Sequence, residues 1–164
     1  MKKPVIIGLI SCGGLVVLGG MAILGTLMYI GMVSPGTSVQ YGHAVKQQYI
    51  TKMRDLHLIG PGERIHFFYS DAILDIEDGM YVLTDRKLFL YSQTWEEPFV
   101  PIEFHEIQAV SLQRDDSFFT DSTLTVDLKN GDAYWFPLSS EQFVDVAFAE
   151  KLKVLSNIEE TPAQ

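Results

Sequence analysis

The sequence TLTVDLKNGDAYWFPL occupies residues 123–138 and carries the strongest β-hairpin signal in the chain. Leu124, Val126 and Leu128 alternate with polar residues, which is typical of a strand with one buried face. Asn130-Gly131 then provides residues that readily adopt the positive φ angles of a tight turn, and residues 133–138 are predicted to return as the partner strand. We therefore expect an antiparallel sheet.

The same alternating pattern extends upstream of this hairpin. It begins at Ile65, continues through residues 72–77 and meets a second hairpin signal at Asp78-Gly79. Thr84-Asp85-Arg86 forms the next predicted turn, with side chains expected to bond the backbone. About seven strands are predicted, over residues 65–69, 80–83, 87–91, 99–102, 107–113, 123–128 and 133–138.

One helix is predicted on each side of the strands. Ser139 and Gln142 match a capping box that would open an amphipathic helix ending near Asn157, well placed to cap the open end of a barrel or pair of sheets. Upstream, residues 38–58 predict a spacer helix. Its apolar stripe either packs on the domain or forms a seam for self-association; the stripe comprises Val45, Tyr49, Met53 and Leu56.

The N-terminal region predicts a membrane anchor. No Asp, Glu, Lys or Arg occurs from Val5 to Val33, a segment longer than the roughly 20 apolar residues that span a bilayer as a helix. Two processing alternatives remain open. In the first, Leu9-Ile10-Ser11-Cys12 is similar to a lipoprotein lipobox, and Cys12 would be lipidated. In the second, the segment is cleaved at another position. Residues 1–33 are interpreted as the anchor, 34–58 as the linker and spacer helix, 59–158 as the folded domain and 159–164 as a polar tail.

Basic residues near the anchor suggest its orientation. Lys2 and Lys3 precede it, whereas the next basic residue is Lys46, so the N-terminus is expected in the cytoplasm and the domain outside an inner (plasma) membrane. Small residues inside the anchor allow another helix to approach closely. The candidate helix-packing residues are Gly13, Gly19, Gly20 and Thr26.

Charge and cysteine content exclude several classes of function. The residues after Val33 hold all 21 acidic residues and 10 of the 12 Lys and Arg, a formal charge of −11. Such a surface repels nucleic acid and anionic lipid headgroups, so neither is an expected partner. Cys12 is the only cysteine, which excludes an intramolecular disulfide and any Cys-based zinc site in the domain.

The local pattern resembles bacterial pleckstrin-homology-like domains. The residues that carry the resemblance are Gly62-Glu63-Arg64-Ile65 and the hairpin of residues 79–91, which contains Leu83-Thr84-Asp85-Arg86. The resemblance covers about residues 59–158. It implies a mainly β, α+β fold: a seven-stranded antiparallel barrel or sandwich capped by a C-terminal helix.

The resemblance also implies a binding or assembly module without catalysis. Eukaryotic relatives grip phosphoinositides through basic residues in the loop after the first strand. Here residues 69–79 contain four acidic residues and no Lys or Arg, so this recognition is not carried over.

Candidate contact residues lie in loops. Phe118 and Phe119 sit inside an acidic turn, where both are difficult to bury, and Trp95 lies in a Glu-rich loop. Arg86 is a further candidate partner contact. The four histidines show no metal-ligand spacing, and no nucleophile motif occurs, so no metal, cofactor or catalytic residue is expected.

Together these patterns predict a single-pass membrane protein with a non-catalytic, PH-like interaction module. Its expected role is that of an accessory or assembly subunit of a membrane complex. The alternatives are a lipid-surface or small-ligand binding module and a membrane-tethered hydrolase. An apolar pocket would favour the former, and a cleft with convergent Ser, His and Asp would favour the latter.

Overall fold

The chain divides into two units, residues 1–34 and 35–164. The computed structural model describes residues 35–36, 38–114 and 121–158, all of which belong to the second unit. Among these residues, none of the helices is long and apolar enough to cross a membrane. The predicted anchor lies outside the described residues.

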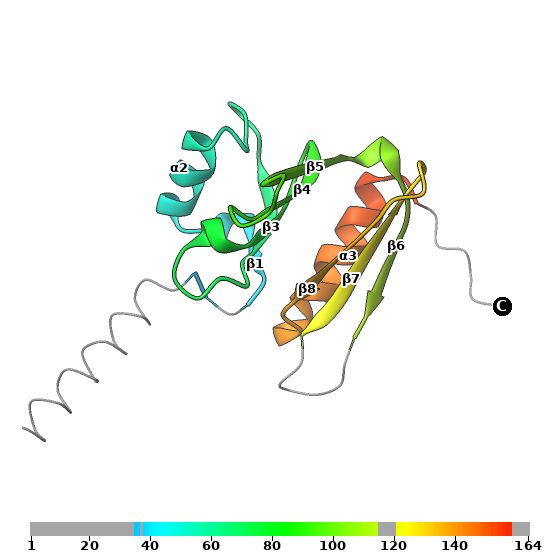
Figure 1. The fold of residues 1–164 in the computed structure, drawn as a ribbon. Coiled ribbons are helices and arrows are strands. Elements are labelled where there is room, and N and C mark those ends of the chain that lie inside the picture. The colour runs from blue at the N-terminus through cyan, green and yellow to red at the C-terminus, as the bar shows by residue number, and fades with distance from the viewer. Residues whose placement is uncertain (1–34, 37, 115–120, 159–164) are drawn as a thin grey trace, which may run out of the picture. The chain divides into compact units, whose positions relative to one another are not determined.

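The described chain is mainly β, with two α-helices and short 3-10 helices at the connections (Figure 1). The strands are β1 (Gln40–Tyr41), β2 (Ile65–Tyr69), β3 (Met80–Thr84), β4 (Lys87–Tyr91), β5 (Phe99–Glu103), β6 (Ile107–Gln113), β7 (Ser122–Leu128) and β8 (Ala133–Leu138). The helices are η1 (Gly42–Ala44), α2 (Gln47–Asp55), η2 (Ile76–Asp78), η3 (Phe104–Glu106), η4 (Glu141–Phe143) and α3 (Val144–Leu155).

The strands form two antiparallel sheets. Sheet A has the order β1-β2-β3-β4-β5 and sheet B the order β6-β7-β8. The sheets do not join into a closed barrel, and eight strands occur in the described residues where about seven were predicted. The additional strand is β1, where Gln40 pairs with Phe68 and Tyr41 with Phe67. It was missed because its two residues fall inside the predicted spacer helix.

The spacer helix is shorter than predicted. Helix α2 begins at Gln47 rather than near Ser38, since Gly42 lies in a 3-10 turn packed tightly against the carbonyl of Ile65. The predicted stripe is correct: Val45, Tyr49 and Met53 are buried. They pack on one face of sheet A with Phe68 and Phe89, among others, so the stripe lies inside this chain's own core rather than free for self-association.

The second core lies between sheet A, sheet B and α3. Residues from all three are fully buried, among them Leu83 and Leu88 of sheet A, Leu124 of sheet B, and Phe148 and Leu152 of α3. Helix α3 runs alongside sheet B on the side that faces sheet A (Figure 1). Sheet A therefore buries both faces, which explains why every residue of β3 is buried.

The alternating pattern over residues 72–77 and the hairpin signal at Asp78-Gly79 were both misleading. Residues 72–77 do not form a strand: Asp75 accepts a hydrogen bond from the backbone of Glu77 and opens η2, whereas Ile73 is exposed. Gly79 has a φ of −178°, so it is extended backbone at the entry to β3 and not the turn residue of a hairpin. Side-chain hydrogen bonds here take the backbone groups that a strand would pair.

The capping box was also wrong. Gln142 and Phe143 both have positive φ, and α3 begins only at Val144 with no side-chain cap. The Ser139 hydroxyl accepts from Glu141 N–H across 3.5 Å, one residue short of the predicted pattern. The amphipathic helix itself is confirmed, since Val144, Phe148 and Leu152 are buried.

Candidate functional site

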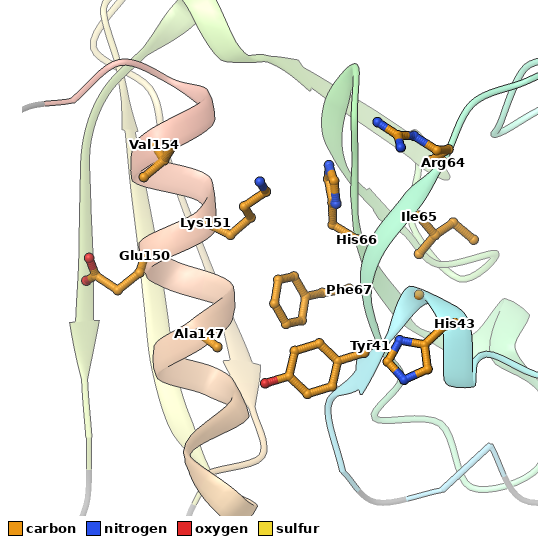
Figure 2. A pocket seen from close by; sticks show the side chains of 11 residues that line it. Tyr41, His43, Arg64, Ile65, His66, Phe67, Ala147, Glu150, Lys151 and Val154 are labelled. Carbon is orange, nitrogen blue, oxygen red and sulfur yellow. The ribbon is translucent and has the colours of Figure 1, made fainter.

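A groove with a volume of about 660 Å³ lies between α3 on one side and β1, η1 and β2 on the other (Figure 2). Its lining is largely apolar or aromatic. The lining residues are Tyr41, Gly42, His43, Arg64, Ile65, His66, Phe67, Ala147, Glu150, Lys151 and Val154. A groove of this size suits a small ligand or a few side chains of a partner.

Gly42 brings η1 close to β2 at one wall of the groove. A Cβ atom at this position would overlap the carbonyl group of Ile65, so only glycine permits the approach. Next to it, Tyr41 pairs with Phe67 in the antiparallel β1–β2 ladder, and this pairing fixes the position of Tyr41 along β2. The contacts of β1 and η1 with β2 thus present the side chains of Tyr41 and His43 at the groove's edge.

Aromatic rings make up this wall and the floor. The Tyr41 ring lies 5.1 Å from the Phe67 ring and 5.9 Å from the imidazole of His43, measured between centroids. Phe67 is buried and meets Phe148 of α3 at 5.5 Å. Tyr41 remains 44% exposed. Ring contacts therefore hold an accessible aromatic side chain in place over a rigid base.

Lys151 provides the groove with a cation. Its side chain extends from α3 toward the β2 side, where His66 and Phe67 lie (Figure 2). Within the described residues, no carboxylate lies within 4.0 Å of its ammonium group. Burial, followed by the positive charge of Lys151, lowers the pKa of His66 below its ordinary value. The charged residues of the lining are thus Lys151, Arg64 and Glu150.

The other charged lining residues have partners within the chain. Arg64 Nε lies 3.3 Å from Asp85 Oδ2, and Arg64 N–H donates to Asp85 Oδ1 across 3.0 Å. The hydrogen bond from the backbone N–H of Arg64 lowers the pKa of Asp85. Burial of Asp85 acts in the opposite direction, and the Arg64 side chain lowers the pKa further. Glu150 Oε1 lies 2.8 Å from Lys153 Nζ, and the Glu150 side chain lies on the side of α3 away from β2 (Figure 2).

The residues predicted as partner contacts lie elsewhere. Trp95 is 39% exposed in the connection between β4 and β5. Arg86 follows β3 at the opposite end of β4, reaches the carbonyl of Pro61 at 3.5 Å and lines a smaller cavity of about 270 Å³. The structure therefore does not bring these two residues together. Phe118, Phe119, Gly13, Gly19, Gly20 and Thr26 lie outside the described residues.

The expected turn chemistry at Thr84-Asp85-Arg86 is confirmed. Thr84 Oγ1 accepts from the backbone N–H of Arg86 and of Lys87, each across 3.1 Å, and donates to the Lys87 carbonyl.

In the described part of the chain, no group of three His, Cys, Asp or Glu side chains is placed to hold a metal ion.

Comparison with solved structures identifies the fold. The chain is similar to the crystal structure of a DUF1696 family protein with a pleckstrin-homology domain from Shewanella loihica PV-4, with a TM-score of 0.52 and 16% sequence identity. The match covers 74% of this chain and 99% of the other. The domain has a pleckstrin-homology-like fold. No protein-family model matches the sequence, and no curated protein matches it significantly.

A pleckstrin-homology domain from Shewanella amazonensis SB2B is also similar to this chain, at a TM-score of 0.48 and 13% identity over 66% of this chain and 86% of that one. At these identities the likeness concerns the fold alone.

Sequence reasoning missed the groove of the PH-like domain. Tyr41 and His43 were assigned to a continuous helix, although Gly42 between them is a poor helix residue and signalled a break. Lys151 was indistinguishable from any solvated lysine on the polar face of an amphipathic helix. Its position opposite β2 depends on long-range packing that no local pattern contains.

Proposed function

We propose that this protein is a membrane-tethered, non-catalytic interaction module that acts as an accessory or assembly subunit of a membrane protein complex. The observation that carries the proposal is the accessible groove of the PH-like domain, with its exposed aromatic edge and a lysine that has no carboxylate within 4.0 Å in the described part of the chain. The uncharged segment of residues 5–33 supports a tether at an inner membrane with the domain outside. No cofactor enters the proposal.

A second candidate is a module that binds a small apolar ligand or a lipid. The largely apolar lining of the groove favours it, since small-molecule sites combine apolar walls with few polar groups. The acidic loop between β2 and β3 does not favour an anionic headgroup there. In that loop Asp75 and Glu77 are bound to Lys52, and Asp71 accepts from the hydroxyl of Tyr81.

The third sequence-based alternative, a hydrolase, gains no support from the groove. Its lining includes His43 and His66 but neither serine nor aspartate. A nucleophile needs an adjacent base and an orienting group, and this lining does not bring such a set together.

Purification of the full chain from membranes tests the proposal. An affinity tag at the C-terminus, mild detergent extraction and chemical cross-linking before purification should recover a membrane protein in fixed stoichiometry. Recovery of the chain alone would contradict the subunit role. Lipid or a small molecule bound in stoichiometric amounts, seen by native mass spectrometry without a protein partner, would instead support the second candidate.

A further inference from the structure

We propose that the groove between α3 and the β1–η1–β2 segment binds a short acidic, apolar segment of the partner protein. A carboxylate of that segment pairs with Lys151, and neighbouring apolar side chains pack between Tyr41 and Val154. This inference rests on the proposed function and names the chemistry of the partner.

Charge complementarity carries the first step. The chain after Val33 has a formal charge of −11, so an acidic segment is repelled over most of the surface. The groove combines a cation with a largely apolar lining: Lys151 has no carboxylate within 4.0 Å among the described residues, and the remaining charged lining residues, Arg64 and Glu150, are both paired. His43, His66 and Tyr41 complete its titratable groups. Repulsion elsewhere and attraction here direct an acidic segment to this site.

The shape of the apolar surface carries the second step. Val154 of α3 is 66% exposed and Tyr41 of β1 is 44% exposed, and both line the same groove. Between them lies buried Phe67, with Ala147 leaving room on the helix side (Figure 2). An exposed tyrosine fixed by ring contacts, next to an uncovered aliphatic residue, is the arrangement that anchors partner side chains at interfaces.

Site-specific photo-cross-linking in membranes tests the inference on the full chain. A photoreactive phenylalanine analogue replaces Val154, and the matched control replaces Phe143, which is also 66% exposed and lies next to the start of the same helix. Cross-linked peptides are mapped by mass spectrometry. We expect Val154, and not Phe143, to cross-link to a partner segment that holds Asp or Glu beside apolar residues.

Charge reversal then tests the pairing. Lys151→Glu should lower the cross-link yield at Val154 about tenfold, because like charges face each other, and a Lys in place of the partner's carboxylate should restore it. Arg54→Glu is the control, since Arg54 is exposed on α2 and does not line the groove, and it should change the yield less than about twofold. Circular dichroism of each variant verifies the fold.

The outcomes separate this inference from the proposed function. Cross-links to lipid, to a second copy, to residues 159–164 of the same chain or to a segment without carboxylates would overturn the acidic-segment inference. So would a yield unaffected by Lys151→Glu. A complex that is purified intact but never cross-links through Val154 refutes only the groove assignment, whereas the absence of any complex refutes the subunit role itself.

Discussion

Arg114 Nε donates to Asp145 Oδ2 across 2.9 Å and joins the end of β6 to the first turn of α3. The carboxylate of Asp145 is fully buried, and the same oxygen accepts from the Ser122 hydroxyl at 2.6 Å. Arg114 also donates to the carbonyl of Ser140 and lies 4.2 Å above the ring centroid of Phe143. This pair fixes the position of α3 on sheet B, and hence the helical wall of the groove.

Substitution of Arg114 is predicted to lower the free energy of unfolding more than substitution of Asp145. Arg114→Met leaves a buried carboxylate with only a hydroxyl donor and should lower the free energy of unfolding by about 3 kcal/mol. Asp145→Asn should cost about 1–2 kcal/mol, because the Arg114 side chain is 29% exposed and can turn to water. Urea unfolding of the full chain in mild detergent, followed by tryptophan fluorescence, measures both. A larger loss for Asp145→Asn would refute the asymmetry.

Local patterns predicted most of the sheet. The strand at Ile107–Gln113 and the partner strand at Ala133–Leu138 were placed at their observed ends. These segments alternate because one face is buried, and a hairpin needs only neighbouring residues to form. The resemblance to PH-like domains, drawn from the hairpin of residues 79–91, agrees with the fold of the solved relative.

What could not be predicted depends on contacts between distant residues. Asp145 was an ordinary polar position on a helix, and its burial follows from Arg114, 31 residues away. The alternation over residues 72–77 was misleading because Lys52 of α2 draws Asp75 and Glu77 into ion pairs and away from a ladder. The groove likewise arises where α3 faces β1 and β2, which no single segment encodes.

The ion pairs of Lys52 predict a pH-dependent attachment of α2. Hydrogen bonds that Lys52 donates to Asp75 and then to Glu77 raise the pKa of Lys52. Burial acts to raise the pKa of Asp75, but the hydrogen bonds from Lys52 and Glu77 N–H outweigh it and lower the pKa. Because the folded pKa of Asp75 is depressed, its contribution to stability is present above the unfolded value of about 4 and is lost as pH falls through the folded value.

Lys52→Met should therefore reduce the free energy of unfolding by about 0.5–1 kcal/mol at pH 7, a small amount because the pair is partly exposed to solvent. The difference from the native chain should shrink below about pH 4. Urea unfolding at a series of pH values measures it. Arg54→Met removes an exposed basic residue of the same helix and should have little effect; a pH-independent difference for Lys52→Met would contradict the ion-pair account.

In the β7–β8 turn, Gly131 has the predicted positive φ angle but Asn130 does not. Gly131 has a φ of 97°, and its N–H donates to the Leu128 carbonyl at 3.0 Å. Asn130 is not among the described residues with positive φ; its side chain instead accepts from the backbone N–H of Asp132. The turn is thus followed by a glycine in the left-handed region rather than centred on two such residues.

Substitution of Gly131 isolates this conformational requirement. No atom lies within 4 Å of a Cβ placed there, so Gly131→Ala introduces backbone strain without a clash. Gly131→Ala should cost about 1 kcal/mol, whereas Asn130→Gly should cost less than about that amount because it loses only two solvent-exposed hydrogen bonds to Asp132. Thermal unfolding by circular dichroism compares them. Equal stability of Gly131→Ala and the native chain would show that the turn tolerates a side chain.

At Gly42 the opposite holds: lack of space for a side chain, and not the backbone φ angle, requires a glycine. A Cβ at Gly42 would overlap the backbone carbonyl of Ile65, so Gly42→Ala must push η1 away from β2 and widen the groove at Tyr41. Because the obstructing atoms belong to the backbone, relief requires a shift of the chain, and we expect a loss of about 1–3 kcal/mol in the free energy of unfolding.

The matched control is Gly60→Ala, where the nearest atom to an added Cβ is Arg86 Nη1 at 3.5 Å, an ordinary contact. Thermal unfolding of both variants gives the stability comparison. Photo-cross-linking through Val154 gives a second readout, because displacement of Tyr41 should lower the yield for Gly42→Ala even at a temperature where the variant is fully folded. Unchanged yield with reduced stability would mean that Tyr41 takes no part in binding and that the helical wall alone holds the partner.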